Sequence, residues 1–247
     1  MFSLKGKTAL ITGAAKRIGR FLTIELAKQG ATVIIHYNTS EEKAHTLREE
    51  VVKHGAHAYL VRADLSDPTS GDTLINDALT QANHLDILIN NASIFPTTNI
   101  QDVDITSLNH TITVNAWTPF SLCRRFAQKC GQGKIINFLD TRIIGYDFNR
   151  FPYYLSKSML ETLTRSLALK YAPRVTVNAV APGLILPPEG KDLSYLERLK
   201  ETVPLKRYGS ASDIIDAVLF LLHSDFITGQ IIYVDGGKHL IQTVEGV

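Results

Sequence analysis

The sequence predicts a single-domain α/β protein whose doubly wound parallel sheet carries helices on both faces. Three observations lead to this prediction. Short apolar, β-branched runs alternate with longer stretches of helical period along the 247 residues. The runs are apolar at consecutive positions, as in strands that are buried on both faces. No linker, repeat or low-complexity block divides the chain, so we expect residues 1–247 to form one unit.

The expected elements follow one another in regular order. About seven strands are expected, at residues 8–12, 31–36, 58–61, 86–90, 134–139, 175–179 and 231–234. Helices are expected at residues 18–29, 40–54, from 67 onward, 105–129, 152–172 and 211–223. Gly30 ends the first helix, and Asp67 opens the third with Pro68 at its first helical position. Residues 184–205 are expected to form a substrate loop around a short helix, which completes a Rossmann-type domain.

Composition and charge exclude several classes of protein. The 26 Lys and Arg against 24 Asp and Glu leave a net charge of +2, too balanced for a nucleic-acid-binding surface. No apolar run approaches the ~18–20 residues that cross a bilayer, and the N-terminus lacks a signal-peptide pattern. Cys123 and Cys130 lie about two turns apart on one expected helix, where a disulfide does not fit. We therefore expect a cytoplasmic protein without a nucleic-acid or membrane partner.

His54 and His57 have the spacing of metal ligands, but no acidic partner follows in register. No metal is therefore expected.

The segment between the first strand and the first helix is suited to bind a pyrophosphate. It contains Gly13 and Gly19, and small residues let the backbone approach a phosphate at a helix N-terminus. A plain strand-to-helix turn is the alternative interpretation. After the second strand the chain has no carboxylate before Glu41; it reads His36, Tyr37, Asn38, Thr39, Ser40. NADPH is therefore the expected dinucleotide, with its 2′-phosphate held by Lys16, Arg17 or Ser40.

Tyr153 and Lys157 form the only Tyr-x-x-x-Lys pair in the chain. At helical spacing the two side chains share one face. We therefore expect the ammonium to bring the pKa of the phenol from about 10 toward neutrality. Taken alone, the pair is more typical of an exposed helix surface.

These motifs resemble those of the short-chain dehydrogenase/reductase family over essentially the whole chain. Residues 12–19 resemble its Thr-Gly-x-x-x-Gly-x-Gly signature, and residues 90–92 resemble its Asn-Asn-Ala-Gly motif. Asn115, Tyr153 and Lys157 match three members of its catalytic tetrad. The fourth member is normally a Ser thirteen residues before the Tyr, where this chain has Asp140. Thr141 is expected to point to the opposite face of the strand and is a poor substitute.

Three departures from the family pattern resemble its pteridine reductase branch. Arg17 replaces the middle glycine, Asp140 replaces the Ser, and Phe95 follows the fourth strand. The resemblance implies NADPH-dependent reduction of a dihydropterin (dihydrobiopterin, dihydromonapterin or dihydrofolate) to the tetrahydro form. It also implies a homotetramer formed through residues 105–130 and 152–172.

The resemblance assigns a role to each candidate residue. The expected catalytic residues are Asn115, Asp140, Tyr153 and Lys157. The expected substrate-binding residues are Arg17, Ser93, Phe95, Asp140 and Tyr153. The expected cofactor-binding residues are Gly13, Lys16, Arg17, Ile18, Gly19, His36, Tyr37, Asn38, Ser40, Asp64, Leu65, Asn91, Ala92, Ser93, Tyr153, Lys157, Pro182, Gly183 and Leu184.

The residue at position 140 separates the possible substrate classes. An ionised Asp140 would repel the negative charge that develops on oxygen when a ketone is reduced. A carboxyl group suits an imine, because the ring nitrogen must gain a proton as hydride reaches carbon. Three alternatives stay open: a carbonyl reductase acting on 3-oxoacyl thioesters, an NADP-binding sensor without turnover, and an inactive relative.

Overall fold

A computed structural model describes residues 2–241, 244 and 245 of the chain. Within these residues the main sheet has seven parallel strands in the order β3-β2-β1-β4-β5-β7-β8. Their bounds are β1 (Thr8–Ile11), β2 (Thr32–Tyr37), β3 (Ala58–Arg62), β4 (Ile87–Asn90), β5 (Gly133–Phe138), β7 (Val175–Pro182) and β8 (Ile231–Val234). The expected doubly wound parallel sheet is therefore confirmed.

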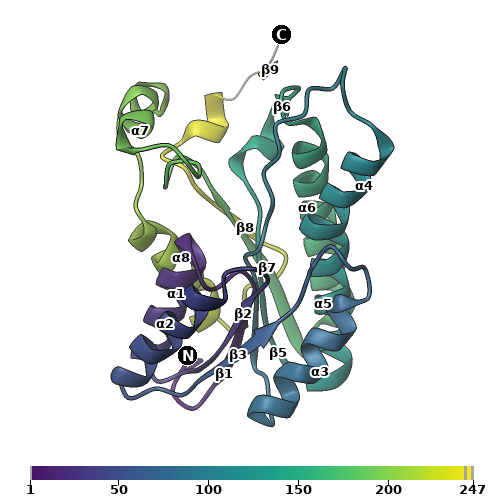
Figure 1. Cartoon of the computed structure of the whole chain (residues 1–247), viewed down its shortest axis with the longest axis vertical. Coiled ribbons are helices and arrows are strands. Elements are labelled where there is room, and N and C mark those ends of the chain that lie inside the picture. The colour runs from purple at the N-terminus through teal and green to yellow at the C-terminus, as the bar shows by residue number, and fades with distance from the viewer. Residues whose placement is uncertain (1, 242–243, 246–247) are drawn as a thin grey trace.

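Helices cover both faces of this sheet (Figure 1). One face carries α1 (Arg17–Lys28), α2 (Glu41–Lys53) and α8 (Ala211–His223). The other carries α3 (Ser70–Ala82), α5 (Thr118–Cys130) and α6 (Phe151–Tyr171), with α4 (Ile105–Ile112) leading into α5. The short helix α7 (Leu193–Leu199) lies beyond the sheet, near the top of Figure 1.

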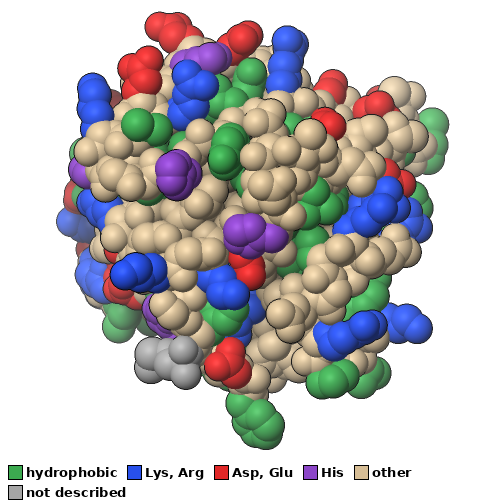
Figure 2. All heavy atoms as spheres, turned by 90° about the horizontal axis from the view of Figure 1, so that it is seen from below, with side chains coloured by type: hydrophobic (Ala, Val, Ile, Leu, Met, Phe, Trp, Pro, Cys, Tyr) green, Lys and Arg blue, Asp and Glu red, His purple; other side chains and the backbone are tan. Residues whose placement is uncertain are grey.

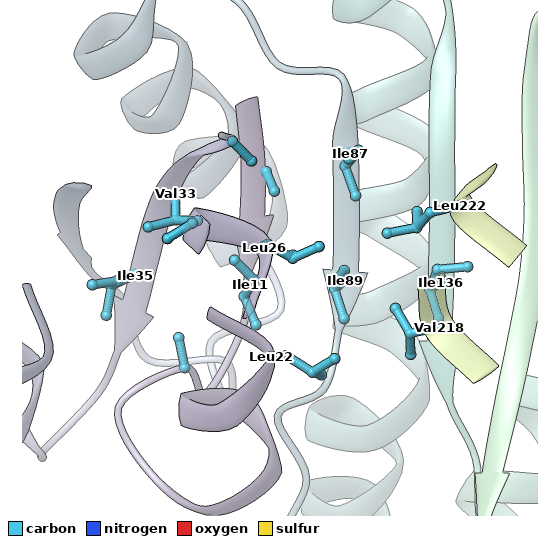
Figure 3. Close-up of a cluster of buried hydrophobic side chains, with 14 of the residues drawn as sticks. Ile11, Leu22, Leu26, Val33, Ile35, Ile87, Ile89, Ile136, Val218 and Leu222 are labelled. Carbon is cyan, nitrogen blue, oxygen red and sulfur yellow. The ribbon is translucent and has the colours of Figure 1, made fainter. Parts of the chain in front are cut away.

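The core explains why the strands are apolar at consecutive positions. Neighbouring strand residues point to opposite faces, and in β1 both Leu10 and Ile11 are fully buried. Ile11 packs in the cluster under α1 and α8 that Figure 3 shows, whereas Leu10 packs in the cluster under α3 and α5. The same division separates Ile89 from Leu88 in β4. Two layers of helices therefore require strands without polar alternation.

The strand order places a ligand crevice at one edge of the sheet. From β1 the chain runs outward through β2 and β3, and then crosses back to β4 on the other side of β1. The connections that leave the carboxyl ends of β1 and β4 therefore diverge, which opens a crevice between them.

The structure corrects several expected boundaries. The third helix begins at Ser70, not at Pro68, because Asp67 instead accepts hydrogen bonds from the backbone N–H and the hydroxyl of Thr69 in a turn. The helix expected over residues 105–129 is interrupted by a π-helical turn, η1 (Thr113–Trp117). The strand expected to end at residue 179 continues to Pro182, so this proline ends the strand rather than following it.

The sequence pattern missed the short elements. These are the 3₁₀ turns η2 (Thr141–Ile144), η3 (Lys200–Thr202) and η4 (Lys238–Ile241), and a small parallel pair formed by β6 (Tyr146–Asp147) and β9 (Val244–Glu245). Elements of two to four residues are too short to show a hydrophobic period.

The surface and the cysteines agree with the composition. Figure 2, seen from the side opposite α7, shows basic and acidic side chains interspersed, without a continuous basic stripe on that face. Both cysteines of α5 are free, as expected. No helix among the described residues is both long and apolar enough to cross a membrane.

Candidate active site

A cavity of about 810 Å³ lies at the carboxyl edge of the sheet. Its volume falls within the range of small-molecule sites. The segments that follow β1, β2, β3, β4, β5 and β7 all contribute to its lining, as does α7. Nearly all of the predicted site residues line it: Gly13, Lys16, Arg17, Ile18, His36, Tyr37, Asn38, Ser40, Asp64, Leu65, Asn91, Ala92, Ser93, Phe95, Asp140, Tyr153, Lys157, Pro182, Gly183 and Leu184. The two that do not are Gly19 and Asn115.

The turn after β1 depends on its glycines. Gly13 has φ +62°, and a Cβ there would lie 3.0 Å from the Cα of Ala92. A Cβ on Gly19 would lie 2.4 Å from the carbonyl oxygen of Gly13, which no side chain tolerates. Gly19 is therefore a packing residue of the turn. Arg17 takes φ +53°, a backbone conformation that favours glycine, and its exposed side chain reaches the cavity.

The side chains of Asn91 and His36 hold the turn after β1 in place by hydrogen bonds to its backbone. The amide of Asn91 donates hydrogen bonds to the carbonyl oxygens of Thr12 (2.8 Å) and Gly13 (3.2 Å). The Nδ1 atom of His36 accepts from the Gly13 N–H (3.1 Å), and Nε2 donates to the carbonyl oxygen of Ala63 (3.1 Å). Burial lowers the pKa of His36 to about 4, so its ring is neutral. Both ring nitrogens are occupied within the protein, which makes His36 a support of the turn.

The segment after β2 has the character expected for a 2′-phosphate site. Asn38, Thr39 and Ser40 line the cavity there, and Ser40 precedes the first residue of α2. None of the described lining residues between β2 and α2 is acidic. Lys16 lines the same cavity, and its ammonium lies 3.8 Å from the carboxylate of Glu189 in the segment between β7 and α7.

Tyr153 and Asp140 meet in the lining of the same cavity. The phenol of Tyr153 donates a hydrogen bond of 2.8 Å to Oδ2 of Asp140. The other oxygen of Asp140, Oδ1, accepts from the backbone N–H of Arg142 at 2.8 Å. Because both oxygens accept hydrogen bonds, this arrangement is that of a carboxylate. Lys157, one turn after Tyr153 on α6, donates from Nζ to the carbonyl oxygen of Phe138 at 2.7 Å.

Burial has the largest influence on the pKa values of Asp140, Tyr153 and Lys157. It raises the pKa of Asp140, an effect that the positive charge of Arg142 opposes. It also raises the pKa of Tyr153 well above its ordinary value, and the neighbouring Asp140 carboxylate adds to that rise. Burial lowers the pKa of Lys157 to about 8, against the influence of Asp140. The expectation that Lys157 brings the phenol pKa toward neutrality is therefore wrong in this structure.

Thr141 does not take the place of the family's Ser, as expected. Its hydroxyl donates to Oδ2 of Asp235 at 2.7 Å and so turns away from Tyr153. The reason differs from the expected strand alternation, because β5 ends at Phe138 and Thr141 begins the 3₁₀ turn η2.

Asn115 lies beneath the cavity in the π-helical turn η1 and is fully buried. Its amide donates to the carbonyl oxygen of Ile94 (2.9 Å) and to the hydroxyl of Ser156 (3.1 Å). Its oxygen accepts from the Ile94 N–H (2.9 Å) and from the hydroxyl of Ser93 (3.1 Å). The side chain thus positions the loop after β4 against α6, and it does not itself reach the cavity.

Phe95 stands at the cavity wall with 38% of its surface exposed. Its ring meets that of Tyr153 edge-on, with centroids 4.5 Å apart and an interplanar angle of 80°. The guanidinium groups of Arg150 and Arg142 lie 4.4 Å and 5.6 Å from its centroid. An exposed ring beside Tyr153 is placed to contact a planar ligand.

Comparison with known proteins agrees with this geometry. The family model described as Enoyl-(Acyl carrier protein) reductase matches residues 13–239. The chain is 32% identical over 244 residues to the 3-oxoacyl-(acyl-carrier-protein) reductase FabG of Staphylococcus epidermidis, a match that covers 95% of this chain and 99% of that protein. It is 34% identical over 245 residues to FabG of Aquifex aeolicus, covering 95% and 98%. The chain belongs to the short-chain dehydrogenase/reductase family.

This membership confirms the expected family and the class of oxidoreductase. A solved structure with a different name is also similar to this chain. FolM alternative dihydrofolate reductase 1 from Brucella suis, in complex with NADP, has a TM-score of 0.91 and 32% identity, and the match covers 99% of both chains. The proteins similar to this short-chain dehydrogenase/reductase thus include ones named as 3-oxoacyl-(acyl-carrier-protein) reductases and as an alternative dihydrofolate reductase.

Sequence reasoning missed several residues of the site. Arg142 contacts Asp140 and lines the cavity. Tyr195 of α7 and Lys238 of η4 also line the cavity. The sequence held a signal for the position of Arg142. An Asp side chain often accepts a hydrogen bond from the backbone N–H two residues later and so closes a turn. Tyr195 lies in the segment of residues 184–205, which was expected to form a substrate loop around a short helix, but Tyr195 itself was not singled out. Nothing local in the sequence places η4 at this cavity, since that requires the tertiary fold.

Proposed function

We propose that this protein uses NADPH to reduce a dihydropterin to the tetrahydro form. The observation that carries the proposal is the 2.8 Å hydrogen bond from Tyr153 to Asp140, at the position where the family pattern has a Ser. A carboxylate there opposes the build-up of charge on a ketone oxygen. It can serve an imine, because reduction of the C6–N5 double bond adds a proton to nitrogen.

The site residues would have separate roles in this reaction. Bound NADPH would supply the hydride that reaches C6 of the pterin. Asp140, whose pKa is raised by burial, would take a proton from solvent and with Tyr153 pass it through a water molecule to N5. Lys157 would keep a positive charge beside this pair. Arg17, Ser93 and Phe95 would orient the ring.

The residues present fit NADPH. The glycine-dependent turn after β1 brings backbone N–H groups and the N-terminus of α1 to the cavity, which suits a pyrophosphate. Lys16 and Arg17 add two cations, and the described lining between β2 and α2 includes no carboxylate. The NADP complex of the Brucella suis relative supports the same cofactor.

Reduction of 3-oxoacyl thioesters is the second candidate, because the FabG relatives are named for it. One assay separates it from the first. The protein is mixed with NADPH and, in separate reactions, dihydrobiopterin, dihydrofolate and an acetoacetyl thioester, and the loss of NADPH absorbance is followed. Oxidation that depends on a pterin or folate supports the proposal. Oxidation only with the thioester overturns it, and NADPH binding without turnover favours a sensor.

We also propose that the protein is a homotetramer formed through residues 105–130 and 152–172. Large apolar side chains are exposed on these elements: Ile105, Trp117, Met159 and Leu169. Exposed apolar surface of this kind favours association. Light scattering coupled to size-exclusion chromatography measures the mass directly, and a monomeric mass contradicts this assembly.

A further inference from the structure

Arg142 ties the carboxylate of Asp140 to a second, buried carboxylate. Its Nε lies 3.9 Å from Oδ1 of Asp140, and its Nη1 donates a 2.7 Å hydrogen bond to Oδ2 of Asp147. The side chain of Asp147 is only 3% exposed, and its Oδ1 accepts from the backbone N–H groups of Asn149 and Arg150 at 3.1 Å each. Asp147 is therefore a fixed anchor for the guanidinium.

The position of Arg142 also links the two parts of the site that would meet a substrate. The same guanidinium lies 5.6 Å from the ring centroid of Phe95, and the side chain lines the cavity. Three hydrogen-bonded steps thus lead from the loop at Asn149 through Asp147 and Arg142 to the Asp140–Tyr153 pair. The sequence motifs assign no role to Arg142.

Several other charged or titratable groups surround Asp140. Tyr153 and Lys157 face it from α6, and Arg150 lies beside the Phe95 ring that contacts Tyr153. Arg17, from the turn after β1, and Lys238, from η4, line the same cavity. Asp235 faces the adjacent Thr141. Arg142, in addition to these groups, makes both a backbone contact and a charge contact with the carboxylate of Asp140.

We propose that Arg142, anchored by Asp147, is a positioning residue that holds the Asp140 carboxylate against Tyr153 and fixes the pH at which that carboxylate takes up a proton. This inference rests on the proposed function, in which Asp140 passes the proton. A cation within about 4–6 Å favours the charged form of a carboxyl group. Burial raises the pKa of Asp140 and the charge of Arg142 opposes that rise, so removing the charge raises the pKa further.

The test is a direct titration of Asp140. Protein labelled with carbon-13 at the aspartate carboxyl groups is titrated by NMR, and the Asp140 resonance is assigned by its loss in Asp140→Asn. In Arg142→Gln we expect the midpoint to rise by roughly one pH unit. The pH limb of kcat for a dihydropterin should move in the same direction. Arg142→Lys, which restores the charge, should return the midpoint toward that of the wild type.

Arg150→Gln is the matched control, because it removes the other cation beside Phe95, whereas the charge contact described for Asp140 comes from Arg142. Its midpoint should stay at the wild-type value. An unchanged midpoint in Arg142→Gln, or equal shifts in both variants, overturns the proposal. Arg142→Met, which keeps an apolar stem, replaces the Gln variant if that variant does not fold. The NMR titration needs no turnover, so a wild-type protein inactive on dihydropterins would reject the proposed function and leave this test intact.

Discussion

The turn that follows β1 and the turn that follows β5 lie at the same edge of the sheet, but different forces hold them. The first is held by neutral groups: the amide of Asn91, the uncharged ring of His36, and the close contact of Gly13 with Gly19. The second is held by charges, since Asp140 accepts from Tyr153 and lies beside the guanidinium of Arg142.

This difference separates two tasks. Neutral hydrogen bonds and close packing do not change with pH near neutrality, so the folded turn after β1 keeps one conformation there. Buried charges exchange protons with one another and with solvent, so the turn after β5 can take part in chemistry. Changes at the second turn should therefore reduce turnover and spare the fold. Changes at the first turn should weaken the fold and cofactor binding.

Tyr153→Phe should produce the largest effect. The change removes the phenol that donates to Asp140 and keeps the ring that packs against Phe95. We expect kcat for a dihydropterin to fall by about 10²–10⁴-fold, the usual contribution of a positioned acid–base group. Steady-state kinetics measure this loss, and fluorescence titration measures NADPH affinity separately. Tyr154→Phe, on the same helix but outside the lining of the cavity, is the control and should retain wild-type kcat.

Asp140→Ser should reverse the preference between the two substrate classes. A hydroxyl at this position can donate to a developing oxyanion but supplies no proton to a ring nitrogen at neutral pH. We expect turnover of a dihydropterin to fall roughly 10²-fold and turnover of an acetoacetyl thioester to rise relative to it. Asp140→Asn keeps the size of the side chain and should lose pterin turnover without that relative gain. Undiminished pterin turnover in the Ser variant would remove Asp140 from the reaction.

The comparison of the two turns also explains what the sequence could predict. The strands, the main helices and the turn after β1 follow from local patterns, because apolar runs, Gly13 and Gly19 are readable in order along the chain. The pairing of Asp140 with Tyr153 was expected from the family resemblance, and the structure places them 2.8 Å apart.

Other features of the site depend on contacts between distant segments. His36 was expected to contact the cofactor; it lines the cavity, and its ring also joins the turn after β1 to Ala63 after β3, which the sequence did not predict. The raised pKa of Tyr153 comes first from burial, and burial is a property of the whole fold. The π-helical turn at Asn115 has no period that differs visibly from the flanking α-helix.

Gly19→Ala tests whether packing alone holds the turn after β1. The added Cβ would meet the Gly13 oxygen at 2.4 Å and the Asn91 amide at 2.7 Å, and backbone must shift to admit it. We expect the free energy of unfolding to fall by about 1–3 kcal/mol. We also expect NADPH affinity to fall. Chemical denaturation and fluorescence titration measure the two effects. Gly55→Ala is the control: it lies at positive φ after α2 with open space around it, so it can lose stability but should keep NADPH affinity.

The stability of the turn after β1 should depend on pH through His36. Burial lowers its pKa from 6.5 to about 4, so between these values the unfolded chain binds more protons than the folded protein. Stability therefore rises with pH across this window, and the contribution of His36 is lost as the pH falls from 6.5 toward 4. Between pH values of about 7 and 5 we expect a loss of about 2 kcal/mol from this residue.

Denaturation at a series of pH values measures the slope of stability against pH. His36→Asn keeps an acceptor for the Gly13 N–H and should flatten the slope by this amount. His54→Asn changes an exposed histidine at the end of α2 and should leave it unchanged. Equal slopes in the wild type and His36→Asn would mean that the turn tolerates a charged ring, and the contrast between a neutral turn and a charged turn would fail.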